Sequence, residues 1–136
     1  MQDSIPLPKK KMLYEDLAET AVVVFKHNQV LLRRCQEGER WAGLWDFPRF
    51  VSDKQKSARH DRDEVKRLTG VDVDVDPDLV TMKHGVTKYR ITLSCRSAKF
   101  VSGRLRRDVE LAWVSTKSLD EYPLSVTGRK IAKWLK

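Results

Sequence analysis

The apolar residues of this 136-residue chain are spaced in two ways, and each spacing predicts one kind of element. Continuous or alternating apolar positions predict strands, because successive strand side chains point to opposite faces. Such positions occur in residues 21–25, 30–34, 71–75, 88–100 and 110–114. Apolar residues three or four apart predict helices at residues 57–69 and 127–135. The order β-β-α-β-β-β-α predicts an α+β domain with a mixed sheet layered against helices.

Several residues are suited to the ends of these elements. Ser57 is a candidate N-cap for the first helix, and Gly70 suits the position after its last turn. Thr127 is the candidate N-cap of the second helix, and Ser115 can cap a short turn after the last strand. Asn28 is expected to take a positive φ in a hairpin turn between the first two strands.

The charge of the chain favours an anionic partner. Lys and Arg outnumber Asp and Glu by 27 to 19, which gives a formal net charge of +8 at pH 7. Such an excess in a small domain is typical of proteins that bind polyanions, DNA above all. The alternative is that the basic residues are scattered and only keep the protein in solution.

The length predicts one domain, residues 13–136, preceded by a basic arm of residues 1–12 that contains two prolines and three consecutive lysines. No apolar run approaches the roughly 20 residues of a membrane helix. The arm also lacks the apolar segment of a secretory signal. We therefore expect no membrane partner and a cytoplasmic location.

The large apolar side chains and the two thiols are expected mainly in the core. Cys35 and Cys95 lack the paired spacing of a zinc site and are expected to be buried free thiols. Trp113 and Trp134 are expected to pack in the core. The indoles of residues 41 and 45 are expected to anchor their loop, with stacking on a base as the alternative.

One segment carries a family resemblance. Residues 30–34 and 41–48 read VLLRR and WAGLWDFP, and a loop, a helix and Gly70-Val71 follow. This arrangement resembles the Nudix fold, and within it the C-terminal domain of MutY-type adenine DNA glycosylases. HGVTKYRITL at residues 84–93 resembles the lesion-recognition loop of that domain, and residues 110–135 resemble its ending. The resemblance implies a Nudix fold with a mixed sheet between helices.

The Nudix box, G-x5-E-x7-R-E-U-x-E-E-x-G-U with U a bulky aliphatic residue, can be placed on residues 49–71 without a gap. Four positions agree with the pattern: Glu64, Val65, Gly70 and Val71. Five positions depart from it: Arg49, Gln55, Asp63, Arg67 and Leu68. The departures include the two adjacent glutamates of the pattern.

These departures bear on metal binding. Nudix hydrolysis uses magnesium ions, and hard cations need several oxygen ligands. Only Glu64 remains, and Arg67 lies one helical turn away, so Glu64 is expected to be a helix-surface or ion-pairing residue and not a metal ligand. We therefore predict no metal site, no cofactor and no catalytic residue. Magnesium is a cofactor only under the alternative in which Asp61, Asp63 and Glu64 hold a metal in a rearranged site.

The resemblance implies candidate contacts to a DNA lesion. Val86, Thr87 and Lys88 stand where the glycosylase domain has an aromatic residue, a Ser or Thr, and a His. His84 begins this segment, and its alternative is a turn residue bonded to the backbone. Arg49 and Arg90 are candidate contacts to DNA phosphates.

Three functions follow from these observations. The leading prediction is a non-hydrolytic Nudix-fold module that binds DNA and recognises 8-oxoguanine opposite adenine in base excision repair. Its partners would be DNA and an upstream glycosylase domain or repair proteins. The first alternative is a Nudix hydrolase of nucleoside di- or triphosphates with altered metal ligands. The second alternative is a protein-interaction module.

Overall fold

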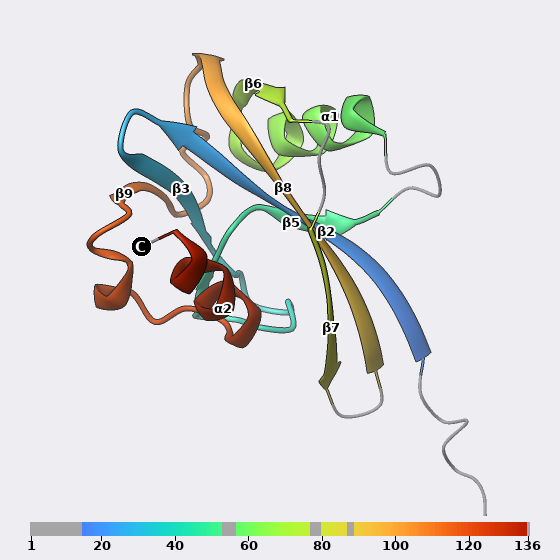
Figure 1. The fold of residues 1–136 in the computed structure, drawn as a ribbon. Helices are drawn as coiled ribbons and strands as arrows, with labels where there is room; N and C mark the ends of the chain where they lie inside the picture. Colours follow the sequence, from blue (N-terminus) through green and yellow to red (C-terminus); the bar gives the residue numbers. More distant parts are fainter. Residues whose placement is uncertain (1–14, 53–56, 77–79, 87–88, 136) are drawn as a thin grey trace, which may run out of the picture.

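The computed structural model describes residues 15–52, 57–76, 80–86 and 89–135, so the predicted basic arm lies outside the described residues. Two long strands form the centre of an eight-stranded mixed sheet (Figure 1). Strand β2 (Glu15–Lys26) runs parallel to β8 (Tyr89–Gly103) along eleven paired positions, from Glu15–Tyr89 to Phe25–Lys99. This parallel pair links the two halves of the chain.

The other strands extend the sheet from this central pair. Strands β3 (Gln29–Arg34), β4 (Trp45–Asp46) and β9 (Leu111–Ser115) lie on the β2 side, and β9 pairs with β3. Strands β6 (Val71–Val75) and β7 (Val80–Val86) both pair antiparallel with β8. Strand β5 (Arg49–Val51) pairs antiparallel with β2.

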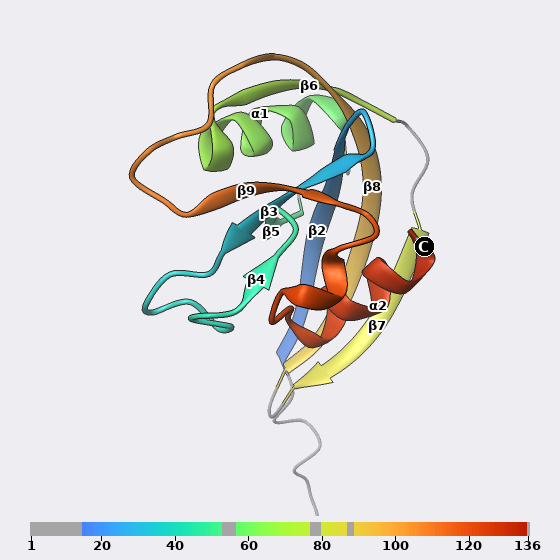
Figure 2. The same ribbon diagram turned by 90° about the vertical axis from the view of Figure 1, so that its left-hand side faces the viewer.

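Two helices cover opposite faces of the sheet. Helix α1 (Ala58–Thr69) packs on one face, and α2 (Val126–Trp134) packs on the other, preceded by the 3-10 helix η2 (Leu119–Glu121) (Figures 1 and 2). Strand β2 shows why two cores form, because Val22 and Val24 join the α1 core while Ala21 and Val23 join the α2 core. The predicted mixed sheet between helices is confirmed.

The ends of α1 agree with the predicted caps. The Ser57 hydroxyl accepts a hydrogen bond from the His60 amide at 3.1 Å. Gly70 ends the helix with φ of 92° and donates its amide to the Lys66 carbonyl. A Cβ at Gly70 would lie 2.3 Å from the Arg104 carbonyl oxygen, so the glycine also allows the loop after β8 to approach the helix. Ser115 caps its turn as predicted, accepting from the Lys117 amide.

Two local predictions were wrong. Helix α2 is capped by Ser125, whose hydroxyl accepts from the Gly128 amide at 3.0 Å, while Thr127 lies inside the first turn. In the turn between β2 and β3, His27 takes the positive φ of 57° instead of Asn28. The turn is also tighter than predicted, because Lys26 and Gln29 already form a strand pair.

Three strands were not predicted. Strands β4 and β5 contain two and three residues, which is too short for an alternating pattern to be detected. Strand β7 pairs with β8 over seven positions, from Val80–Cys95 to Val86–Tyr89. The N-terminal ends of β2 and β8 and the C-terminal end of β7 extend beyond both helices (Figure 1).

Within the described ranges, neither helix has the length and apolar character needed to span a bilayer.

The tryptophans and cysteines agree only in part with the expected core. Trp134 is 55% exposed, so its predicted packing is wrong. Trp45 is partly buried and packs edge to face on Tyr122 at 5.3 Å between ring centroids. Trp113 is partly buried against the α1 core. Both thiols are free, and Cys95 is buried while Cys35 is half-buried.

Candidate functional site

The Nudix-box positions lie on β5 and α1, and their chemistry agrees with the sequence analysis. Arg67 donates two hydrogen bonds to the Glu64 carboxylate, at 2.8 and 2.9 Å. These hydrogen bonds lower the pKa of Glu64 and keep the carboxylate ionised. Leu68 is buried in the α1 core, whereas Asp63 is exposed. The predicted ion pair is confirmed, and Gln55 lies outside the described residues.

The alternative metal site that includes Asp61 is contradicted by the orientation of α1. Asp61 points toward the sheet and is only 1% exposed. Its carboxylate pairs with Arg96 of β8, with Nε and Oδ2 2.9 Å apart. Asp61 therefore cannot join Asp63 and Glu64 around one ion. Within the part of the chain that the structure describes, no group of three His, Cys, Asp or Glu side chains is arranged to hold a metal.

A pocket of about 500 Å³ lies where the loop after β3, strand β5 and the C-terminal end of α1 meet. Its wall is unusually rich in charge. The described arginines that line it are Arg33, Arg40, Arg49, Arg67 and Arg106. The described carboxylates that line it are Glu19, Glu39, Asp46 and Asp108. The pocket wall therefore carries one more formal positive charge than negative charge.

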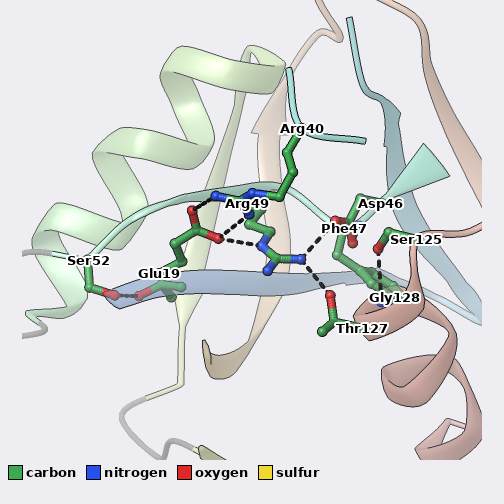
Figure 3. A network of polar contacts seen from close by, with 10 residues as sticks. Glu19, Arg40, Asp46, Phe47, Arg49, Ser52, Ser125, Thr127 and Gly128 are labelled. Carbon is green, nitrogen blue, oxygen red and sulfur yellow. Dashed lines mark hydrogen bonds and ion pairs between the residues drawn. The ribbon is translucent and has the colours of Figure 1, made fainter. Parts of the chain in front are cut away.

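Arg49 is the centre of the buried charge network in this wall (Figure 3). Its Nε donates to Glu19 Oε1 at 2.8 Å, and its Nη1 donates to Asp46 Oδ2 at 3.3 Å and to the Thr127 hydroxyl. Arg40, from the loop after β3, donates to both Glu19 oxygens, at 2.9 and 3.2 Å. The network thus joins β2, β4, β5, the loop and α2.

The strand register explains why these charges meet. Arg49 pairs with Ala21 across the antiparallel β2–β5 pair. Glu19 lies two residues from Ala21, on the same face of β2. Diagonal neighbours on one face are within reach of long side chains, so the guanidinium of Arg49 reaches the carboxylate of Glu19. Arg33 is brought beside the network by its pairing with Asp46.

Burial and charge shift the titration of these groups in opposite directions. Burial raises the pKa of Glu19, but the hydrogen bond from Arg40 and the charges of Arg49 and Arg40 together lower it. At Asp46 burial outweighs Arg49, so its pKa is raised. Burial also raises the pKa of Cys35 to about 11, which keeps this pocket thiol protonated and weakly nucleophilic.

Among the described residues, two arginine nitrogens of the wall are buried without a hydrogen-bond partner. They are Nε of Arg33 and Nη2 of Arg49, whose side chains are 11% and 8% exposed. Leaving a buried donor unpaired costs about 1–3 kcal/mol, and more for a charged group. An oxygen-rich anion supplies the acceptors that these donors lack.

The predicted DNA contacts are placed as follows. His84 and Val86 lie on β7, and Arg90 pairs with Gly85 at the start of β8. Thr87 and Lys88 lie outside the described residues, so the contacts predicted for the segment remain predictions. Arg49 lies in the pocket wall, where its side chain is 8% exposed and bonded to Glu19, so its contact to DNA also remains a prediction.

Most of the pocket charges were missed by the sequence analysis. Glu19 lies in the polar first half of β2, outside the strand predicted for residues 21–25, so no sequence signal marked it. Arg33, Glu39 and Arg40 lie in the segment that was used mainly to identify the family resemblance. Asp46 ends the tryptophan-rich loop and was not considered as a charged group.

The sheet between two helices, with a charged pocket beside the helix that follows β5, defines a Nudix-type domain. A family model described as NUDIX domain matches residues 20–134. The chain therefore belongs to the Nudix family.

Solved structures support the same fold. A MutT NUDIX hydrolase from Burkholderia pseudomallei is similar at 17% identity and TM-score 0.75, covering 90% of this chain and 99% of that one. The MutT protein from Methanosarcina mazei Go1 has 20% identity and TM-score 0.75, covering 90% and 94%. The NUDIX domain of Shewanella oneidensis NrtR, complexed with ADP ribose, has 15% identity and TM-score 0.67, covering 93% and 90%. No curated protein sequence matches the chain.

These comparisons overturn the leading functional prediction. The similar structures are mostly MutT-like and other Nudix hydrolases, and the family model describes a general NUDIX domain. They favour the hydrolase alternative over a DNA-binding module of an adenine glycosylase. The narrower likeness to the MutY C-terminal domain is not shown by any of them. The Nudix scaffold was identified correctly, whereas the predicted function was wrong.

Proposed function

We propose that this chain is a Nudix hydrolase of nucleoside di- or triphosphates with an altered set of site residues. The observation that carries the proposal is the arginine-lined pocket between β5, the loop after β3 and α1. Guanidinium groups bind phosphate oxygens in pairs and neutralise the charge of a pyrophosphate. The proposal places the phosphates of the substrate against this wall.

The usual metal does not fit this donor set. Glu64 is held by Arg67, and the neighbouring box position is the apolar Leu68. The chain's own residues would instead bind and orient the phosphates, and arginines stabilise the charge that develops on a transferring phosphoryl group. Glu39 and Asp108 are pocket carboxylates that also face solvent, so either can orient a water molecule. Trp41 lines the same pocket and offers a surface for a base.

Relatives support this substrate class. The Burkholderia structure is described as a MutT NUDIX hydrolase, and the Shewanella NUDIX domain was solved with ADP ribose, which contains a diphosphate. A pocket of about 500 Å³ is within the range that holds small-molecule ligands. ADP ribose is therefore a suitable first probe for this chain.

A second candidate function is binding of the same ligands without turnover. One observation favours it, namely the Glu64–Arg67 ion pair at the helix position where the family pattern places carboxylates. A protein of this kind would bind nucleotides in the same pocket and release no product.

The test is a product assay on the full chain. The chain is incubated with ADP ribose and with nucleoside di- and triphosphates, with magnesium or manganese, and release of AMP, phosphate or pyrophosphate is measured. We expect release, and we expect Arg40→Gln to raise KM about tenfold through loss of a charge-assisted hydrogen bond. The control Arg62→Gln removes an exposed arginine of α1 that does not line the pocket. Binding without release would favour the second candidate, and absence of both would contradict the proposal.

A further inference from the structure

We infer that the pocket binds the phosphates of its nucleotide as a free anion, held by guanidinium groups, and not as a complex with a divalent cation. The inference rests on the proposed function and concerns how the same pocket recognises its ligand. Three features of the pocket wall support it: the pairing of its carboxylates, its excess of arginine and its unpaired donors.

First, every described carboxylate of the wall is already bonded to an arginine. Glu39 accepts from Arg33 at 2.8 and 2.9 Å, and Asp108 is held by Arg106. Glu19 and Asp46 are held by the Arg49 network described above. A hard cation requires several oxygen ligands, so it would have to displace more than one guanidinium from this wall. A phosphate needs only one guanidinium, that of Arg40, to leave its carboxylate.

Second, one carboxylate serves two arginines. Glu19 is bonded to both Arg40 and Arg49, and Arg49 is bonded to Asp46 as well. The side chain of Arg49 is 8% exposed, whereas that of Arg40 is 26% exposed and extends from a loop. Arg40 can therefore turn to a phosphate while Glu19 keeps its bond to Arg49.

Third, Arg33 Nε and Arg49 Nη2 have no acceptor among the described residues. Both nitrogens are shielded from solvent, so a phosphate oxygen reaches them only if neighbouring side chains shift. Arg40 lies beside Arg49 in the network (Figure 3), so a movement of Arg40 toward a phosphate would bring that phosphate toward Arg49. A magnesium ion bound to the same phosphates would bring a positive charge toward these guanidinium groups and oppose the contact.

The inference is tested by calorimetric titration of the full chain with ADP ribose, once in excess EDTA and once in excess magnesium chloride. We expect binding in EDTA, with an affinity equal to or higher than in magnesium, because the cation neutralises the charge that the arginines attract. Binding that occurs only with magnesium would overturn the inference and leave the proposed function standing. Absence of binding in both solutions would contradict the proposed function itself.

Three variants test which residues bind the phosphates of ADP ribose. Arg40→Gln is expected to weaken binding in EDTA about tenfold, because it removes one charge-assisted contact. Arg62→Gln, the matched control on the exposed face of α1, is expected to leave the affinity unchanged. Replacing Arg67 and Leu68 with Glu restores the family carboxylates, and we expect this double variant to require magnesium for tight binding. Equal affinities for the Arg40 and Arg62 variants would contradict the inference. An affinity of the double variant that does not depend on magnesium would contradict it as well.

Discussion

The box helix and the pocket wall both carry arginine–carboxylate pairs, but the surroundings of these pairs differ greatly. In the Glu64–Arg67 pair of α1 the side chains are 22% and 59% exposed, and the pair bridges one helical turn. In the Glu19–Arg49 pair they are 12% and 8% exposed, and the pair joins two strands. Exposed pairs contribute little to stability, whereas a buried charge requires its partner. The comparison teaches that the buried charges of this domain centre on Arg49, at the start of the box, whereas the charged pair on the box helix is exposed and local.

The largest expected effect is at the pocket wall. Arg49→Ala leaves Glu19 and Asp46 buried without their shared partner, and we expect a loss of about 3–5 kcal/mol in the free energy of unfolding. Urea denaturation followed by circular dichroism measures this loss. The exposed Arg62→Ala variant serves as the control and should change stability by less than about 0.5 kcal/mol. A loss at Arg49 as small as that of the control would remove the contrast between the two regions.

Gly70 connects the box helix with the rim of the pocket. Its φ of 92° disfavours alanine, and an added Cβ would lie 2.3 Å from the Arg104 carbonyl oxygen, which must then move. We expect Gly70→Ala to cost about 2–3 kcal/mol, with Gly38→Ala as the control. Gly38 has the same φ of 92° but open space around it, so its variant isolates the backbone strain, about 1 kcal/mol. Equal losses would show that the contact with the loop contributes nothing.

The buried Glu19 predicts a pH dependence. Its pKa is lowered from the ordinary value of 4.5, so its stabilising effect is present above that value and is lost as the pH falls through the lower folded value. Asp46, whose pKa is raised, acts in the opposite sense. We expect the stability difference between the native chain and Glu19→Gln to shrink as the pH falls below the ordinary value of 4.5. Chemical denaturation at a series of pH values measures it, and a difference that does not change with pH would contradict the assignment.

The smallest expected effect is on the box helix. Arg67→Ala removes an exposed pair within one helix, and we expect a change of at most about 0.5 kcal/mol in the free energy of unfolding. Thermal and urea denaturation, compared with Arg49→Ala under the same conditions, measure it. A loss of several kcal/mol would mean that the Glu64–Arg67 pair has a structural role that its exposure does not indicate.

The fold could be predicted from the sequence because it depends on local signals. Apolar alternation located the long strands, and Ser57 and Gly70 marked the ends of α1. The cap of α2 was assigned wrongly, because Ser125 and Thr127 are both capable N-caps in the sequence. In the structure Ser125 accepts from the Gly128 amide, whereas Thr127 accepts from Arg49.

The pocket could not be predicted in the same way. Its central contact joins Glu19 to Arg49, thirty residues apart, through the register of a three-residue strand. No periodicity signals so short a strand, and no local rule signals that Arg40 bonds to the same carboxylate. The box was easier to find because its positions follow a fixed spacing within one segment. The residues of the pocket wall come from several segments, so no single pattern identifies them.

The central claim is that the arginines of the pocket wall bind the phosphates. The most direct measurement is an NMR titration of the 15N-labelled chain with ADP ribose in EDTA, following arginine Nε–H signals and backbone amides together. The account predicts shifts at Nε–H of Arg33, Arg40 and Arg49 and unchanged amides along β7. Shifts confined to β7 and the start of β8, with the pocket arginines unchanged, would contradict it.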